Sequence, residues 1–328
     1  MATIYDIARM AGVTPTTVSK VLAGKGSISA ATRERVMQYA RELNYQPNLI
    51  ARSLIKGRTD VIGLVLHEMS NLFYAEIAEI AERLAYERNL RIFVTTIGKS
   101  EGQQLLQDLA LRRVDGLIIA AGTISPETFN SMSDLHIPAV YCFWEASEQQ
   151  VDHYVAFDFQ QAGRLAAEHL LELGHRRFGV VSHVQHSRFT GFKETLLQNG
   201  ISLDDAYIQW GESNLESGRV SGHKLLTMPE RPTAIFATND MSAMGVLSAA
   251  WDLGLRVPQD ISIVGHDDNE ITAYTTPPLT TIRIDKPAML ATSIDVLLSA
   301  IDGKPVMTTP SFPARLMTRQ SSGPCPEE

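Results

Sequence analysis

Residues 4–22, with the sequence IYDIARMAGVTPTTVSKVL, have the pattern of two short helices joined by a tight turn. Two apolar faces repeat at helical spacing, the first made of Ile7, Ala8 and Ala11 and the second of Val18, Val21 and Leu22. Gly12 lies between them, where the chain must turn and a left-handed backbone is expected. Thr14 can cap the second helix, and Pro15 then occupies its first position, where no N–H is needed. The pattern predicts a helix-turn-helix that binds duplex DNA, with an ordinary helical hairpin as the alternative.

The charge distribution favours the DNA-binding interpretation. Residues 1–59 carry nine Lys and Arg against three Asp and Glu, a net charge of +6. The whole chain has a net charge of −8, so the remaining residues carry −14. A basic head on an acidic body is typical of a small module that binds phosphates, attached to a body that does not touch DNA.

Composition limits the class of protein. The chain has 328 residues, of which 44% are hydrophobic, which predicts a globular protein with room for two or three domains. It shows no secretion signal and no apolar run long enough to span a bilayer. With only Cys142 and Cys325, a disulfide framework is not expected, and the cytoplasm is the predicted location. No spacing of Cys and His predicts a metal site, and no cofactor is expected.

Two further segments follow the predicted helix-turn-helix. Residues 29–44 read as a third helix, with Ser29 as its cap and Val36, Ala40 and Leu43 at helical spacing. Residues 47–57 are compatible with a short helix that is unstable alone in water. Their apolar side chains could pack on a partner helix or enter a minor groove, whereas a plain linker is the alternative.

From residue 60 onward, apolar strands alternate with amphipathic helices. The predicted strands are 61–66, 91–96, 116–120, 139–142, 178–182, 234–237 and 262–264. The predicted helices are 73–88, 102–111, 190–197 and 241–253. Near-continuous apolar strands between helices predict doubly wound parallel sheets in two lobes, with a ligand cleft at the carboxyl ends of the strands.

The loops that follow these strands hold aromatic and polar side chains together. They are residues 67–74, 143–145, 183–188, 238–240 and 265–269. Rings next to Asn, Asp and Arg suit a polyhydroxylated ligand, which stacks its C–H faces and needs donors and acceptors for its hydroxyls. For each aromatic residue taken alone, packing beneath the loop is the alternative interpretation.

The chain resembles the lactose/galactose repressor (LacI/GalR) family of transcription regulators over essentially its full length. Besides the opening helix-turn-helix, the similarity depends on the motifs at residues 44–48, 51–54, 61–63, 114–116, 174–175, 239–245, 257–260, 265–268 and 276–281. The resemblance implies a three-helix head, a hinge helix and a two-lobed core similar to periplasmic binding proteins. It also implies a homodimer that binds a palindromic operator.

The resemblance assigns DNA contacts to residues of the head and hinge. They are Tyr5, Thr14, Pro15, Thr16, Thr17, Ser19, Lys20, Ser29, Asn48, Ala51 and Leu54. Pro15, Thr16 and Lys20 would face base edges, and Leu54 would enter the minor groove as a wedge. Many members have Arg where this chain has Lys20, so the resemblance does not predict the identity of the outer bases of the operator.

The resemblance also assigns effector contacts to residues of the cleft. They are Asn71, Phe73, Tyr74, Phe143, Trp144, Asp158, Arg188, Asn239 and Asp267. Several members hold an acidic residue where this chain has Phe143, which implies a different hydroxyl pattern or a larger stacked ligand. The predicted domains are the head at 1–46, the hinge at 47–58 and the core at 59–328. Within the core, lobe one is about 59–159 and 284–314, and lobe two is about 160–283 and 315–328.

The sequence therefore predicts a repressor controlled by a small carbohydrate-like effector, with no catalytic residues. A corepressor-dependent regulator of non-sugar metabolism is one alternative. An exported sugar-binding protein is disfavoured by the basic head and the missing signal. An NAD-dependent enzyme is disfavoured because the turn at residues 67–73 lacks the Gly-x-Gly-x-x-Gly pattern.

Overall fold

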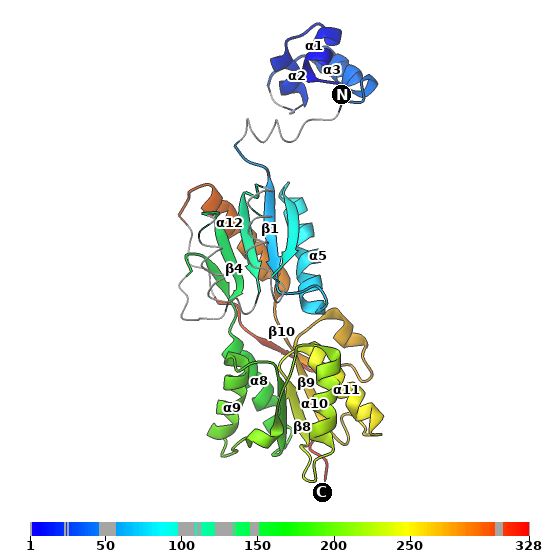
Figure 1. Ribbon diagram of the computed structural model, residues 1–328, viewed down its shortest axis with the longest axis vertical. Helices are drawn as coiled ribbons and strands as arrows, with labels where there is room; N and C mark the ends of the chain where they lie inside the picture. The colour runs from blue at the N-terminus through cyan, green and yellow to red at the C-terminus, as the bar shows by residue number, and fades with distance from the viewer. Residues whose placement is uncertain are drawn as a thin grey trace. The chain divides into compact units, whose positions relative to one another are not determined.

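The chain folds into two compact units, Met1–Thr59 and Asp60–Glu328, which are considered separately below (Figure 1). The structure is a computed structural model. It describes residues 2–22, 24, 26–45, 57–97, 109, 113–121, 134, 136–144, 151–305 and 311–327, with only the backbone at Trp144. Among the helices within these ranges, none is long and apolar enough to cross a membrane.

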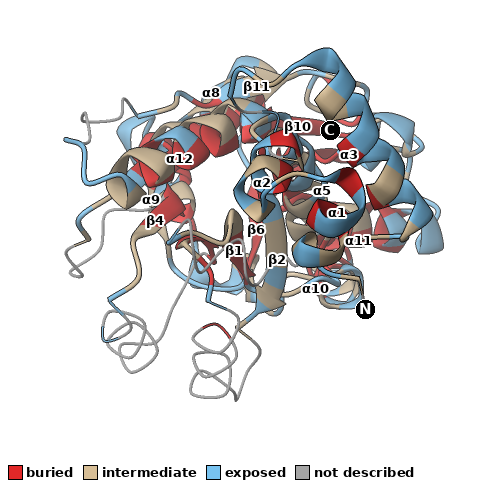
Figure 2. Ribbon diagram, turned by 90° about the horizontal axis from the view of Figure 1, so that it is seen from above, coloured by how far each residue is buried: buried red, intermediate tan, exposed pale blue. Residues whose placement is uncertain are grey.

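The first unit contains the predicted helix-turn-helix. Its helices are α1 (Ile4–Ala11), α2 (Pro15–Leu22) and α3 (Ala30–Glu42). The predicted turn is confirmed, because Gly12 has the left-handed φ of 62°. Ile7, Val18 and Val36, one from each helix, are fully buried and form the centre of the small core. In Figure 2 the buried residues of α1 and α2 are red and their exposed residues pale blue.

Hydroxyl groups cap the helices of this unit. Thr14 Oγ1 accepts a hydrogen bond from the Thr17 amide at 3.2 Å, which confirms the predicted cap of α2. Ser29 Oγ accepts from the Thr32 amide at 3.3 Å and caps α3 as predicted. A reciprocal capping box of Thr3 and Asp6 begins α1, a feature that the sequence reasoning missed. The cap residues fix where each helix begins.

The second unit begins with a parallel sheet that we call, with the helices packed on it, the first lobe. Its described strands are β1 (Val61–Leu66), β2 (Arg91–Thr96), β3 (Gly116–Ala120), β4 (Ala139–Trp144) and β5 (Tyr154–Ala156). They lie in the order β2-β1-β3-β4-β5. Helices α5 (Leu72–Glu87) and α12 (Lys286–Ile301) pack against each other and against this sheet. Leu64 and Val65 are both fully buried, so β1 is covered on its two faces.

The second lobe is built around another sheet, in the order β11-β10-β9-β8-β6-β7. Its strands are β6 (Phe178–Ser182), β7 (Ile208–Trp210), β8 (Ala234–Ala237), β9 (Ser262–Asp267), β10 (Thr280–Arg283) and β11 (Arg315–Met317). Its helices are α8 (Phe159–Glu172), α9 (Ser187–Gln198), α10 (Leu215–Leu226) and α11 (Asp240–Asp252), with short 3₁₀ turns η1 (Asp205–Tyr207) and η2 (Glu270–Tyr274). Pairs α8–α9 and α10–α11 cover opposite faces (Figure 1).

The chain passes between the two lobes at three places. It enters the second lobe after β5, returns to the first between β10 and α12, and leaves again before β11. Phe157 and Phe312 form a parallel bridge that joins two of these passages. The doubly wound, two-lobed architecture expected from the sequence is therefore confirmed.

Most predicted elements of the core match the structure. The predicted bounds of β1, β2, β3, β6 and β8 are identical to those observed. Strands β4 and β9 extend beyond the predicted residues, and α5, α9 and α11 are displaced or lengthened by up to three residues at their ends. The sequence reasoning missed α8, α10, α12 and the short strands β5, β7, β10 and β11. The predicted helix at 102–111 lies outside the described residues except for Leu109.

Candidate functional site

Polar side chains line the exposed face of α2. Thr16, Ser19 and Lys20 are exposed there, while Val18 on the opposite face is fully buried. Thr14 is also exposed, although its hydroxyl is already engaged with Thr17 at 2.9 Å. A helix with one buried face and one exposed polar face has the geometry of a recognition helix that enters a major groove.

The other predicted DNA contacts of the head have more mixed surroundings. Pro15 and Thr17 are half-buried. Tyr5 on α1 is 65% exposed, so its phenol is accessible. Ser29 is also exposed, but its hydroxyl already caps α3. Asn48, Ala51 and Leu54 lie outside the described residues.

In the first lobe, Asn71 lies where β1 leads into α5. Its Oδ1 accepts from the Phe73 amide at 3.0 Å and caps α5, and the residue is 6% exposed. Its Nδ2 donates to the Ser213 carbonyl at 3.4 Å, a contact with the second lobe. Asn71 thus lies at the junction between the lobes.

Aromatic rings gather beside Asn71. The ring of Phe73 lies 5.3 Å from that of Tyr74 and 5.3 Å from that of Phe143, both edge to face. Phe143 has the left-handed φ of 58°, at the point where the register between β4 and β5 shifts. The side chain of Trp144 is outside the described part of the chain. The three described rings form one contiguous apolar wall.

Arg188 is the central cation of the second lobe. Its guanidinium donates to the Thr238 carbonyl at 2.8 Å and lies 4.8 Å above the ring of Phe159. The Asp267 carboxylate is 3.8 Å away, and the Arg188 side chain is 15% exposed. Contacts with a carboxylate and with a ring hold the guanidinium in place.

Asp267 ends β9 and is 4% exposed. Its Oδ1 lies 3.0 Å from His266 Nδ1, and that nitrogen is also 3.1 Å from the Arg188 guanidinium. One nitrogen cannot donate to Asp267 and accept from Arg188 at once. An ionised Asp267 requires a donor, so Nδ1 carries the hydrogen and Nε2 is left as an acceptor. His266 Nε2 has no hydrogen-bond partner among the described residues.

Asn239 begins α11 beside this cluster. Its Oδ1 accepts from the Ser242 amide at 2.8 Å, which fixes the side chain. Its Nδ2 is buried and has no hydrogen-bond partner among the residues described. A fixed, unpaired donor in a buried position is suited to a ligand acceptor.

Asp158 differs from the other predicted effector residues. It is exposed, and its Oδ1 accepts from the Gln161 amide at 2.8 Å, so it caps α8. The structure therefore places Asn71, Phe73, Tyr74 and Phe143 together in the first lobe. It places Arg188, Asn239 and Asp267 at the carboxyl ends of strands in the second lobe.

Three histidines were missed as members of this site. His266 is fully buried and stacks on Phe159 at 5.9 Å, and the rings of His183 and His186 lie 5.0 Å apart. Burial, and then the Arg188 charge, lower the pKa of His186. The signal was available for His266, because it directly precedes Asp267. The loop at 183–188 was predicted to lie at the cleft, but its two histidines were not singled out as effector contacts.

The neutral His266 makes stability depend on pH. Burial first, and then the Arg188 charge, lower its pKa from 6.5 to about 4. A lowered histidine pKa stabilises the fold above pH 6.5, and this contribution is lost as pH falls toward 4. We expect the free energy of unfolding attributable to His266 to fall by about 2 kcal/mol between pH 7 and pH 5.

Urea unfolding at both pH values checks this expectation when His266→Gln is compared with the unaltered protein. His175 also has a pKa lowered by burial, so the unaltered protein should lose more than this amount. The difference between the two proteins isolates His266. Equal pH slopes in the two proteins would contradict the assignment.

A separate cavity of about 780 Å³ opens between α5, η2 and the start of α12. Its lining includes Glu76, Asp268 and Lys286 and none of the nine predicted effector residues. Among the described residues, no group of His, Cys, Asp or Glu could hold a metal ion. The polar cluster of Arg188, Asn239 and Asp267 is thus distinct from this cavity.

Comparisons with known proteins agree with this architecture. The model "Bacterial regulatory proteins, lacI family" matches residues 3–48, and "Periplasmic binding protein-like domain" matches residues 167–322. The HTH-type transcriptional repressor PurR of Vibrio vulnificus (strain CMCP6) is 34% identical over 313 residues, 93% of each chain. PurR of Pectobacterium atrosepticum is also 34% identical and covers 93% of this chain and 92% of its own.

Solved structures extend the similarity to the whole fold. The lac repressor dimer bound to operator and the anti-inducer ONPF has a TM-score of 0.87 at 29% identity, covering 98% of this chain and 99% of that one. A complex of the transcriptional regulator CelR with cellobiose has a TM-score of 0.72 at 30% identity, covering 98% and 100%.

Proposed function

The chain belongs to the LacI family of transcriptional repressors, and from that premise we propose that it binds a palindromic operator as a homodimer under the control of a small polar effector. Members of this family are DNA-binding regulators and not enzymes. The exposed Thr16, Ser19 and Lys20 of α2 support the DNA-reading role. The lac repressor similar to this chain is a dimer on its operator, which supports two heads on two half-sites. Such a repressor acts in the cytoplasm.

The observation that carries the effector proposal is the cluster of Arg188, Asn239 and Asp267. It offers a cation, an amide donor that has no partner among the described residues, and a carboxylate acceptor, all near the carboxyl ends of parallel strands, where ligands of such sheets bind. Phe73 and Phe143 supply an apolar wall in the other lobe. This combination suits a carbohydrate, because hydroxyls need paired donors and acceptors and C–H faces stack on rings. A regulator similar to this chain binds cellobiose.

A flat nitrogen heterocycle is the second candidate effector. Among the described residues, His266 Nε2 is an acceptor and Asn239 Nδ2 a donor without a hydrogen-bond partner, and an acceptor and a donor are what the edge of a planar nitrogen ring requires. The rings of Phe73 and Phe143 could stack on its face. This candidate corresponds to a regulator of non-sugar metabolism.

A thermal-shift screen of the purified protein distinguishes the two candidates. The screen should contain sugars, sugar phosphates and nucleobases at matched concentrations. A ligand at 100 times its Kd stabilises the folded state by about 2.7 kcal/mol, which is a clear rise in Tm. A hit among sugars supports the first candidate, and a hit among nucleobases supports the second. A screen without hits in either class would contradict the effector proposal.

The hinge at 47–58 is proposed to connect effector and operator binding. In this proposal, closure of the lobes changes whether the two hinge segments of a dimer fold against each other on the minor groove. Leu54 would then unstack a base step, and its side chain would contact DNA but not effector.

We expect Leu54→Ala to weaken operator binding about tenfold, since one apolar wedge contributes on the order of 1–2 kcal/mol. Effector affinity should stay unchanged. Fluorescence anisotropy checks this with an operator selected from random-sequence DNA and a scrambled duplex as control. Loss of effector affinity to the same extent would rule out the proposed division between hinge and cleft.

A further inference from the structure

Lys286, the first residue of α12, is 3% exposed although it carries an ammonium group. Its Nζ donates to Glu76 Oε2 at 2.6 Å, to Asn269 Oδ1 at 3.0 Å and to the Asp268 carbonyl at 3.4 Å. Three donors are all that a lysine has, so its hydrogen-bonding capacity is filled. A buried lysine with a full set of partners is held rigidly, because loss of Glu76 would leave its charge uncompensated and loss of either neutral acceptor would leave a buried donor unsatisfied.

These partners belong to different lobes. Glu76 on α5 and Lys286 on α12 both belong to the first lobe. Asp268 and Asn269 come directly after β9 and belong to the second lobe. Glu76 also crosses the boundary itself, because its Oε1 accepts from the Glu270 amide at 2.7 Å. Two first-lobe side chains therefore bind three consecutive residues of the second lobe.

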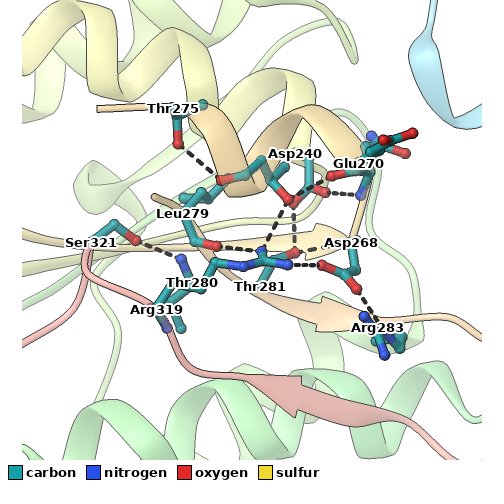
Figure 3. Close-up of polar contacts among 12 residues, drawn as sticks. Asp240, Asp268, Glu270, Thr275, Leu279, Thr280, Thr281, Arg283, Arg319 and Ser321 are labelled. Atoms are coloured by element: carbon teal, nitrogen blue, oxygen red, sulfur yellow. Dashed lines mark hydrogen bonds and ion pairs between the residues drawn. The ribbon is translucent and has the colours of Figure 1, made fainter. Parts of the chain in front are cut away.

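The segment 268–270 is in turn fixed to the rest of the second lobe. The Asp268 carboxylate accepts from Arg283 at 2.6 Å and from Arg319 at 2.5 Å (Figure 3). The backbone N–H of Asn269 donates to the buried Asp240 carboxyl group at 2.8 Å. These bonds couple residues 268–270 to β9, β10 and α11, so a displacement of the segment would move these elements with it.

The same lysine contacts the first-lobe wall of the proposed effector site and a residue adjacent to its second-lobe part. Its Nζ lies 5.4 Å from the centre of the Phe73 ring, a cation–π contact with the first-lobe wall. Asp268, which it contacts, is the residue next to Asp267. Because Lys286 contacts both Phe73 and the neighbour of Asp267, it helps to set the distance between the two sides of the site.

We propose that Lys286 and Glu76 form an interlobe latch that holds residues 268–270 against α5 and thereby sets the affinity of the effector cleft. The latch itself is argued from the contacts above, and its regulatory effect rests on the proposed function. With the latch closed, the cleft is pre-organised, so ligand binding costs less free energy for ordering the two lobes. Without it, the lobes separate more readily and a ligand binds more weakly.

Hydrogen–deuterium exchange of the full chain without ligand tests the latch. The Glu270 amide, which donates to Glu76, is the reporter. We expect its exchange to become at least tenfold faster in Lys286→Met and, as a milder second variant, in Glu76→Gln. The control is Lys304→Met, because Lys304 is 67% exposed and its ion pair with Asp302 stays within its own lobe.

Two exchange results would overturn the latch. One is exchange at Glu270 that stays within twofold of the unaltered protein in both variants. The other is equal acceleration in β8, since this would show general destabilisation of the second lobe and a merely structural role for Lys286. The double variant should exchange no faster than Lys286→Met alone, because both changes break the same latch.

The regulatory effect is tested separately with the compound that gives the largest thermal shift in the screen. We expect its Kd to rise about tenfold in Lys286→Met and to stay unchanged in Lys304→Met. An unchanged Kd together with faster exchange would overturn the regulatory effect. A screen without hits would reject the proposed effector function, while the exchange result still decides whether the latch exists.

Discussion

Replacement of Asp267 by asparagine is expected to lower effector affinity at least about 100-fold while the protein stays folded. The carboxylate is 4% exposed and lies in the cluster of His266 and Arg188, where it can accept hydrogen bonds from ligand hydroxyls. Hydrogen bonds to charged groups contribute about 1.5–3 kcal/mol each, and every 1.36 kcal/mol is a factor of ten. Loss of the charge from one or two such bonds therefore corresponds to about two orders of magnitude.

Asparagine is chosen because the backbone at this position is unusual. Asp267 has a φ of 123°, a conformation that L-residues rarely adopt and that asparagine and aspartate tolerate better than most. Asp267→Asn keeps the size of the side chain and removes its charge. Alanine would add a backbone cost to the loss of the acceptor.

Isothermal titration with the best compound of the screen measures the effect. Asp295→Asn serves as the matched control, because Asp295 is 63% exposed and pairs with Arg88 on the surface. A Kd for Asp267→Asn within threefold of the unaltered protein would reject the assignment of Asp267 to the effector site. A separate thermal melt of the ligand-free variant measures any loss of stability.

The strands of the core could be predicted because parallel sheets bury both faces. Continuous apolar runs such as residues 61–66 and 234–237 have few other folded states, and both appear with the predicted bounds. Short strands such as β7 (Ile208–Trp210) gave no such signal, since three residues are too few to show a pattern.

The helix α10 was missed for a physical reason. Gly218 and Gly222 within it lower helix propensity, and no helix was predicted for residues 215–226. In the structure these glycines permit close packing on α11: a Cβ on Gly218 would lie 2.4 Å from the Ser242 carbonyl oxygen. Tertiary packing on α11 therefore outweighs the low helix propensity of the two glycines, which is all that the sequence shows.

The candidate site could be located from sequence but not its internal bonding. Strand ends in a parallel sheet meet at one edge, so the loops at 183–188, 238–240 and 265–269 could be grouped without coordinates, and the family resemblance assigned Arg188, Asn239 and Asp267 within them. Which side chains pair could not be inferred, because this depends on rotamers. Asp158 caps a helix, while His266 joins the cluster between Asp267 and Phe159.

Lys20→Glu is expected to reduce operator binding at least about 100-fold. Lys20 is exposed in the last turn of α2, on the face opposite the buried Val18. In the proposed complex this face enters the major groove, where a carboxylate would be repelled by phosphates and would lose a donor to base edges, each effect being on the order of 1–3 kcal/mol. Lys304→Glu, with the same charge change on an exposed residue of the core, should bind as the unaltered protein does.

Lys20→Arg separates charge from recognition at the same position. Arginine keeps the positive charge but presents a planar fork that pairs with O6 and N7 of guanine, whereas lysine is a point charge. We expect affinity for the selected operator to stay within about tenfold, while a second selection from random DNA shifts the preferred outer base toward guanine. If Lys20→Glu binds like Lys304→Glu and the Lys20→Arg selection returns the original sequence, Lys20 does not face the bases. In that case the reading face of α2 must be assigned to Thr16 and Ser19 instead.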